Sequence, residues 1–250
     1  MQQTDFQPLL VHLIELRTRL VRAGIGFLLA FAVCFYFSGQ IYDFMVYPLT
    51  SVLPGQKLVS IGIASPFLVQ MKMAAMAAFV VSLPSTLYQA WAFVAPGLYV
   101  HEKKMVLPLI VSSTVLFFCG MAFAYYVVFK TVFGFLSSHA PASMTWLPDS
   151  DQYLSFILGM FLSFGVTFEV PVAIVLLVWI GVVTVEKLRS WRPYVIVGSF
   201  VVAAVITPPD ALSQCMLAIP LWLLFEVGCV VAGWTGRRKV PDAQSDPLEE

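Results

Sequence analysis

Apolar and polar positions divide the chain into six long apolar segments separated by polar or proline-marked stretches. A membrane-spanning helix needs about 20 mostly apolar residues. The six segments cover residues 20–38, 67–92, 105–130, 152–182, 193–207 and 212–234. The pattern therefore predicts an all-α membrane protein with six transmembrane helices. We expect one six-helix domain over residues 1–236 and a disordered cytoplasmic tail over residues 237–250.

The last two apolar segments are irregular. The fifth has about 15 residues between Arg192 and Thr207, which is roughly 22 Å of helix and less than a bilayer core. The sixth is interrupted by Pro220, which lacks the N–H that a continuous helix uses. We therefore expect spans five and six to be short, and the bilayer to thin locally around them.

Composition excludes a soluble protein. Hydrophobic residues make up 60% of the chain and charged residues 11%, with mean hydropathy +0.88. The formal net charge of zero gives no sign of a nucleic-acid partner. The basic residues gather on one side of the predicted membrane, which makes both termini cytoplasmic. They lie at positions 17, 19 and 22, then 103 and 104, then 187, 189 and 192, and finally 237, 238 and 239.

Residues 9–19 form an amphipathic segment before the first span. His12, Glu15 and Arg19 share one face at 100° per residue, and leucines fill an adjoining stripe. We expect this helix to lie on the membrane surface. Glu15 and Arg19 have the spacing of an i,i+4 ion pair, whereas Arg17 points about 160° away from Glu15.

Two acidic residues stand out on the cationic cytoplasmic side. Glu15 is one, and Glu102, beside Lys103 and Lys104, is the other. Either is unremarkable as an exposed or locally paired carboxylate. Together they suggest a site for a cationic ligand, because a carboxylate binds a guanidinium through two parallel hydrogen bonds.

Polar residues inside or beside the spans are costly and therefore informative. Glu169 lies in the middle of span four, two residues before Pro171, which should bend the helix. It is either a neutral group bonded within the chain or a functional contact. Asp210 is placed to cap span six, and Gln214 to bond within or between helices. Lys72 is expected to extend toward the interface.

No catalytic, metal-binding or cofactor-binding motif is present. The sequence has no H-E-x-x-H, G-x-S-x-G or G-x-x-x-x-G-K-[ST] pattern, and its cysteines and histidines are dispersed. We expect no enzyme activity, no cofactor and no metal.

Four ordered motifs resemble the TatC family, the polytopic subunit of the bacterial twin-arginine protein translocase. They are HLIELRTR at 12–19, LP followed by QAWAFVAPGLY and E within 83–102, FGVTFEVP at 164–171, and TPPDALSQ at 207–214. The resemblance covers nearly the whole chain. It implies six helices packed as a concave cup in the bacterial inner membrane.

The resemblance also implies a function in the export of folded proteins. Twin-arginine signal peptides are expected to bind at the cytoplasmic face, with Glu15, Arg17, Phe93 and Glu102 in the site. Glu169 is expected in a membrane-facing cavity. Single-span TatA- and TatB-type subunits are the expected protein partners, in an oligomeric assembly surrounded by lipid. Asp210 and Gln214 are expected near those subunits, at the outer ends of spans five and six.

A proton-coupled secondary transporter that uses Glu169 is the alternative function. The chain lacks the inverted repeat common in such transporters and a second acidic residue in mid-membrane to receive the proton.

Overall fold

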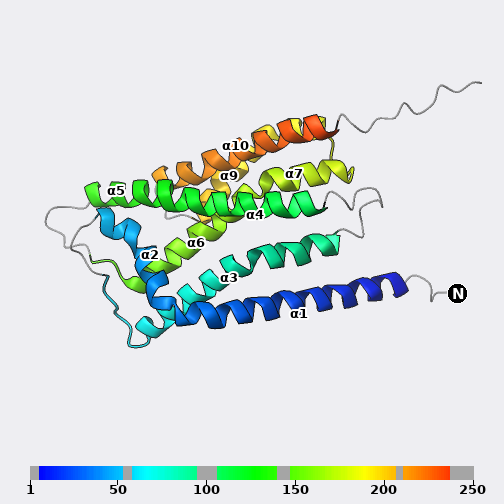
Figure 1. Ribbon diagram of the computed structural model, residues 1–250. Coiled ribbons are helices and arrows are strands. Elements are labelled where there is room, and N and C mark those ends of the chain that lie inside the picture. Colours follow the sequence, from blue (N-terminus) through cyan, green and yellow to red (C-terminus); the bar gives the residue numbers. More distant parts are fainter. Residues whose placement is uncertain (1–5, 53–57, 95–105, 140–146, 207–210, 237–250) are drawn as a thin grey trace, which may run out of the picture. The chain divides into compact units, whose positions relative to one another are not determined.

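The computed structural model describes residues 6–52, 58–94, 106–139, 147–206 and 211–236. These residues are almost entirely helical, as expected, with one isolated bridge between Val59 and Asp149. The helices are α1 (Phe6–Tyr36), α2 (Ser38–Val52), α3 (Ser65–Val94), α4 (Val106–Phe123), the π-helical turn η3 (Ala124–Val128), α5 (Phe129–His139), α6 (Ser150–Phe168), α7 (Val170–Trp179), α8 (Val185–Ser190), α9 (Arg192–Ile206) and α10 (Ala211–Gly236) (Figure 1).

The six predicted spans are all present as helices. Five segments of the described chain are long and apolar enough to cross a membrane, namely Leu13–Tyr36, Ser65–Ala90, Leu107–His139, Ser150–Trp179 and Ala211–Trp234. The shorter apolar helix α9 is the sixth. Its 15 residues confirm the predicted short fifth span.

Helix α10 corrects the prediction of a short sixth span. It has 26 residues and continues through Pro220. One missing N–H removes one hydrogen bond, and the apolar residues on both sides of Pro220 keep the helix intact.

Residues 9–19, which were predicted to lie on the membrane surface, are part of a longer helix in the structure. Helix α1 is continuous over 31 residues and straight in Figure 1, so residues 9–19 belong to the same helix as the first predicted span. The segment between Leu9 and Tyr36 contains no proline at which the helix would end. The location of residues 9–19 on the membrane surface stays a prediction.

The described helices belong to two compact units, residues 1–166 and 167–250, and each is described by itself. The single domain over residues 1–236 therefore stays a prediction. The predicted disordered tail, residues 237–250, lies outside the described residues. In the first unit α1 runs antiparallel along α3, α3 also contacts α4, and α2 packs against α3 and α5 (Figure 1).

Helices α4, η3 and α5 follow one another without a break, so the third span continues to His139 instead of ending at 130. Its buried side chains recur every four residues, at Phe117, Met121, Tyr125, Phe129 and Phe133. On an ideal helix each such step drifts by about 40°. The wider turn of η3 offsets part of the drift and keeps one face of the helix toward the core.

Helix α2 was not expected, because residues 39–66 were treated as a connection. Its buried side chains include Met45, Val46 and Leu49, at helical spacing. Pro48 lies inside this helix, and a proline within a segment argues against a helix when only the sequence is considered. Two hydrogen bonds join the connection after α2 to the start of α6, from the Ser150 backbone N–H and hydroxyl to the Val59 carbonyl at 2.8 and 2.9 Å.

The second unit packs α10 against α7, α9 and α8. Its core contains Ile174, Val175, Leu188 and Phe225. Gly228 permits the close approach of α10 to α7. A Cβ atom added there would lie 2.9 Å from the Pro171 Cα and 2.8 Å from the Ile174 Cδ1.

Candidate functional site

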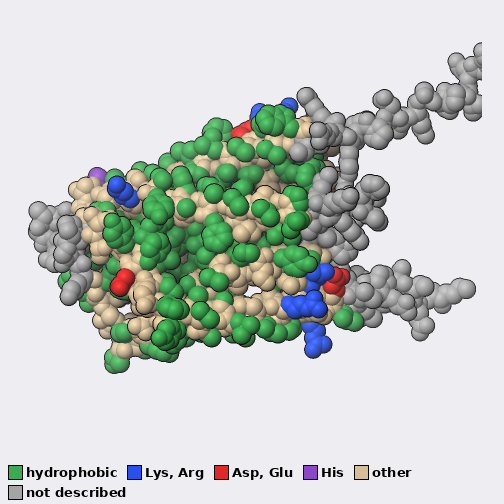
Figure 2. All heavy atoms as spheres, viewed as in Figure 1, with side chains coloured by type: hydrophobic (Ala, Val, Ile, Leu, Met, Phe, Trp, Pro, Cys, Tyr) green, Lys and Arg blue, Asp and Glu red, His purple; other side chains and the backbone are tan. Residues whose placement is uncertain are grey.

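Helix α1 carries the first candidate residues in its N-terminal half. Arg19 donates hydrogen bonds to Glu15 Oε1 from Nε at 3.0 Å and from Nη2 at 2.6 Å. This confirms the predicted i,i+4 pair. The Glu15 side chain is 31% exposed, so the pair lies at a surface that a ligand can reach. Figure 2 shows a group of basic side chains, coloured blue, over this end of α1.

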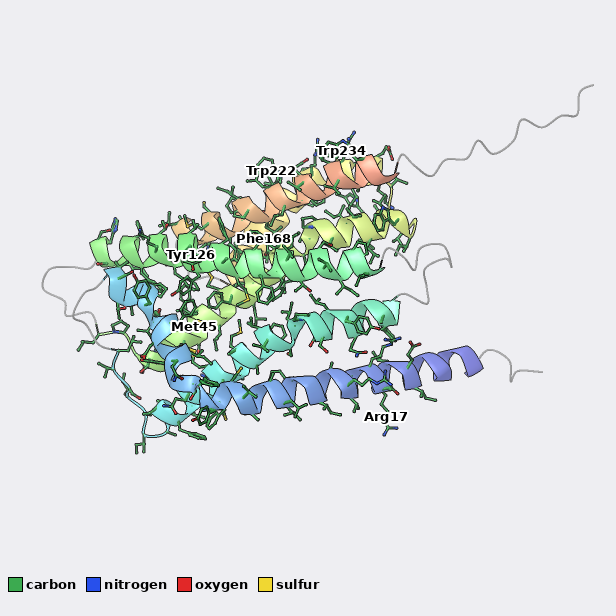
Figure 3. All side chains as sticks on the ribbon, viewed as in Figure 1. Arg17, Met45, Tyr126, Phe168, Trp222 and Trp234 are labelled. Atoms are coloured by element: carbon green, nitrogen blue, oxygen red, sulfur yellow. The ribbon has the colours of Figure 1, made fainter. Side chains whose placement is uncertain are left out.

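Arg17 lies on another face of the same helix. Its side chain is exposed and points away from α3 in Figure 3. The structure therefore keeps Arg17 and Glu15 apart. This agrees with their spacing along the helix, which predicted that the two side chains point in different directions.

The end of α3 lies beside the start of α1, because the two helices are antiparallel (Figure 1). Gly26 and Ser85 mark the contact, where a Cβ atom added to Gly26 would lie 3.9 Å from Ser85 Oγ. Phe93, in the last turn of α3, is half-buried. Glu102 lies outside the described residues, so its position relative to Glu15 stays a prediction.

Gln89 adds a polar group that the sequence analysis did not single out. It lies one turn before Phe93, and its Oε1 is buried and accepts no hydrogen bond from the described residues. A buried amide oxygen without a donor is costly to the fold. The signal in the sequence was an amide in the final turns of a mostly apolar helix.

Glu169 occupies the junction between α6 and α7. It has helical backbone angles, φ −78° and ψ −14°, and stands at the N-cap position of α7, with Pro171 in the first turn. Helix α6 ends at Phe168 and α7 begins at Val170, and the predicted bend between them stays a prediction. Its carbonyl accepts a hydrogen bond from the Ala173 N–H at 3.0 Å, and its side chain is half-buried.

Gln214 lies in the first turn of α10 and is half-buried, next to the buried Ser213. Asp210 lies outside the described residues, and its predicted capping role is untested.

Two ion pairs were missed in the sequence. Lys72 Nζ lies 2.7 Å from Asp151 Oδ1 and 3.3 Å from Ser155 Oγ, and the expectation that Lys72 extends toward the interface stays a prediction. The sequence offered one signal for this pair. Lys72 and Asp151 have opposite charges and lie near the starts of two spans that run in the same direction. In the second unit, Arg192 Nη2 lies 2.6 Å from Glu226 Oε2.

The described residues contain no group of three or more His, Cys, Asp or Glu side chains that would hold a metal ion. What they offer is a partly exposed carboxylate at a cationic helix end and polar residues at helix junctions. Such groups bind and position a ligand.

Residues 11–220 match the model of the family described as "Sec-independent protein translocase protein (TatC)". The chain belongs to the TatC family. It is 49% identical over 243 residues to the TatC protein of Azotobacter chroococcum mcd 1, with 97% of this chain and 95% of that protein covered. It is 50% identical over 229 residues to TatC of Escherichia coli strain K12, with 91% and 89% covered.

A solved structure supports the same conclusion. The chain resembles the crystal structure titled "Twin Arginine Translocase Receptor- TatC", with a TM-score of 0.79 and 35% identity, over 89% of this chain and 98% of that one. This TatC-family chain is therefore a multi-pass membrane component of a Sec-independent protein translocase. Nothing in the comparisons supports the alternative of a proton-coupled transporter.

Proposed function

We propose that this chain is the signal-peptide receptor of a twin-arginine translocase in the bacterial inner membrane, with both termini in the cytoplasm. In this proposal it binds the paired arginines of signal peptides and assembles with TatA- and TatB-type subunits in an oligomer. Membership of the TatC family supports the receptor function, and the side on which the basic residues gather supports the orientation.

The carboxylate of Glu15 carries the proposal. It lies at the cationic end of α1 and is partly exposed. Among the described residues only Arg19 bonds it, and both bonds end on Oε1. Glu15 Oε2 is then the atom offered to a guanidinium of the ligand, and charge-assisted bonds of this kind contribute about 1.5–3 kcal/mol each.

The neighbouring residues extend this site along the end of α3. The half-buried Phe93 offers an apolar contact, and the Gln89 oxygen offers an acceptor for an N–H group. Glu102 follows within the same sequence motif and is proposed as the carboxylate for the second arginine.

Helix α9 supports the proposal of a single-span partner. Val197, Val201 and Val205 repeat every four residues along it, and their side chains are 65%, 58% and 82% exposed in the described structure. An apolar stripe of this kind suits a partner helix. Gln214, together with Asp210, is proposed to contact the same partner through hydrogen bonds.

Crosslinking tests the receptor function. A twin-arginine signal peptide with a photoreactive group next to its arginines should crosslink to the purified full-length protein. Glu15→Gln should abolish most of the crosslink, because the amide offers no negative charge. Glu186→Gln, which removes an exposed acid from α8 instead, should leave it unchanged. No crosslink to the wild-type protein would contradict the receptor function.

A further inference from the structure

Helix α2 contains a backbone acceptor that its own helix cannot satisfy. Pro48 lies in the interior of α2 and has no N–H. In a regular helix the N–H of residue 48 donates to the carbonyl of residue 44. The Phe44 carbonyl therefore needs another donor, because an unpaired backbone carbonyl away from water is destabilising.

Tyr125 supplies that donor. Its hydroxyl donates a hydrogen bond to the Phe44 carbonyl at 2.8 Å. The two rings are stacked, with their centroids 4.7 Å apart and their planes 5° apart. The Tyr125 ring is also stacked with Phe161 of α6, with centroids 6.4 Å apart and planes 8° apart. One side chain thus joins α2, the long α4–η3–α5 helix and α6.

The π-helical turn places Tyr125 for this contact. Turn η3 begins at Ala124, whose carbonyl accepts from the Phe129 N–H, five residues later. Tyr125 is 7% exposed, whereas its neighbour Tyr126 is 69% exposed. Such single π-turns inside α-helices are rare and occur mostly where a side chain has a special task.

We propose that Tyr125 is a positioning residue that replaces the missing N–H of Pro48 and thereby holds α2 in place. Helix α2 forms one wall of an apolar groove of about 470 Å³ in the first unit. Ile41 and Phe44 line it from α2, Val80 from α3, Met121 from α4 and Phe161 from α6. Figure 3 labels Met45 and Tyr126, which also line this groove. Loss of the Tyr125 hydroxyl is expected to make α2, and with it this side of the groove, more mobile.

Hydrogen exchange of α2 in the purified full-length protein tests the proposal. Tyr125→Phe keeps the stacked ring and removes only the hydroxyl. Exchange of the amides of residues 38–52 should become about tenfold faster, which corresponds to about 1.4 kcal/mol. Tyr126→Phe, the matched control on an exposed neighbour, should leave exchange unchanged. Equal exchange in the two variants would overturn the proposal.

A second background separates this role from general packing. Pro48→Ala restores the N–H, so Tyr125→Phe should accelerate exchange much less in Pro48→Ala than in the wild-type protein. Tyr153 is the comparison, because its hydroxyl donates at 3.0 Å to the Met45 carbonyl, and residue 49, a leucine, retains its N–H. Tyr153→Phe should have the same effect in both backgrounds. An equal effect of Tyr125→Phe in both backgrounds would also overturn the proposal.

Discussion

Single side chains decide what the N-terminal end of α1 can bind. Glu15 was identified from its charge and spacing, and its pairing with Arg19 followed from helix geometry. Gln89 and the Lys72–Asp151 pair were not identified, because sequence spacing does not give contacts between different helices. The proposed receptor site thus rests on one described carboxylate with a weak internal partner.

Arg19 should compete with signal peptides for Glu15. An i,i+4 pair on a helix is worth a few tenths of a kcal/mol, so Arg19→Gln should raise the affinity for a twin-arginine peptide about twofold. Arg22→Gln is the control. It removes the same charge three residues later, where the described structure has no bond to Glu15. Equilibrium binding of the peptide to membranes that contain either variant measures the two affinities. The same affinity for the two variants would mean that only the net charge matters.

Glu169 should act through hydrogen bonding at the junction of α6 and α7. In mid-membrane the carboxyl group is costly to ionise, and an amide has the same shape and similar hydrogen-bonding atoms. We expect Glu169→Gln to retain most export of a twin-arginine reporter, and Glu169→Ala or Glu169→Lys to lose it at equal protein level. If Gln is as inactive as Ala, the ionised form of Glu169 is required.

Among the helices, length and apolar character were predictable and irregularities were not. The short α9 followed from the charged and proline-rich residues that flank it. Proline was misleading in both directions: Pro220 does not interrupt α10, and Pro48 concealed α2. At Pro48 a hydrogen bond from another helix compensates for the missing N–H, and such a contact is not visible in a single sequence.

The contact of α10 with α7 depends on Gly228. Gly228→Ala places a methyl group within 3 Å of the Pro171 backbone, so it should destabilise the protein by about 1–3 kcal/mol. Gly198→Ala is the control, since nothing lies within 4 Å of an added Cβ there. Thermal unfolding in detergent should show a lower midpoint for Gly228→Ala alone. Equal midpoints would show that the helices can move apart without cost.

For the whole molecule, the number of spans and the family followed from the sequence, while the packing of α1, α2 and η3 did not. Residues 95–102 of the motif that ends at Glu102, and residues 207–210 of the motif that contains Asp210, lie outside the described residues. Their roles depend on the family resemblance and on experiment.

Membrane orientation has a direct test. A reporter that is active only outside the cytoplasm should work when fused at Gln56 or Ser143 and fail when fused at Lys103 or Lys239. The expectation follows from six spans with the basic residues on the cytoplasmic side. Activity at Lys239 would require an odd number of spans.

The central claim is that Glu15 recognises arginine as arginine, and not merely as positive charge. The decisive measurement compares the binding of a twin-arginine and a twin-lysine peptide to membranes that contain either the wild-type protein or Glu15→Gln. Lysine keeps the charge but lacks the planar fork of N–H groups. Glu15→Gln should therefore weaken the arginine peptide by at least about tenfold and the lysine peptide clearly less. Equal losses for the two peptides would show that Glu15 contributes only negative charge, and would contradict the proposed recognition.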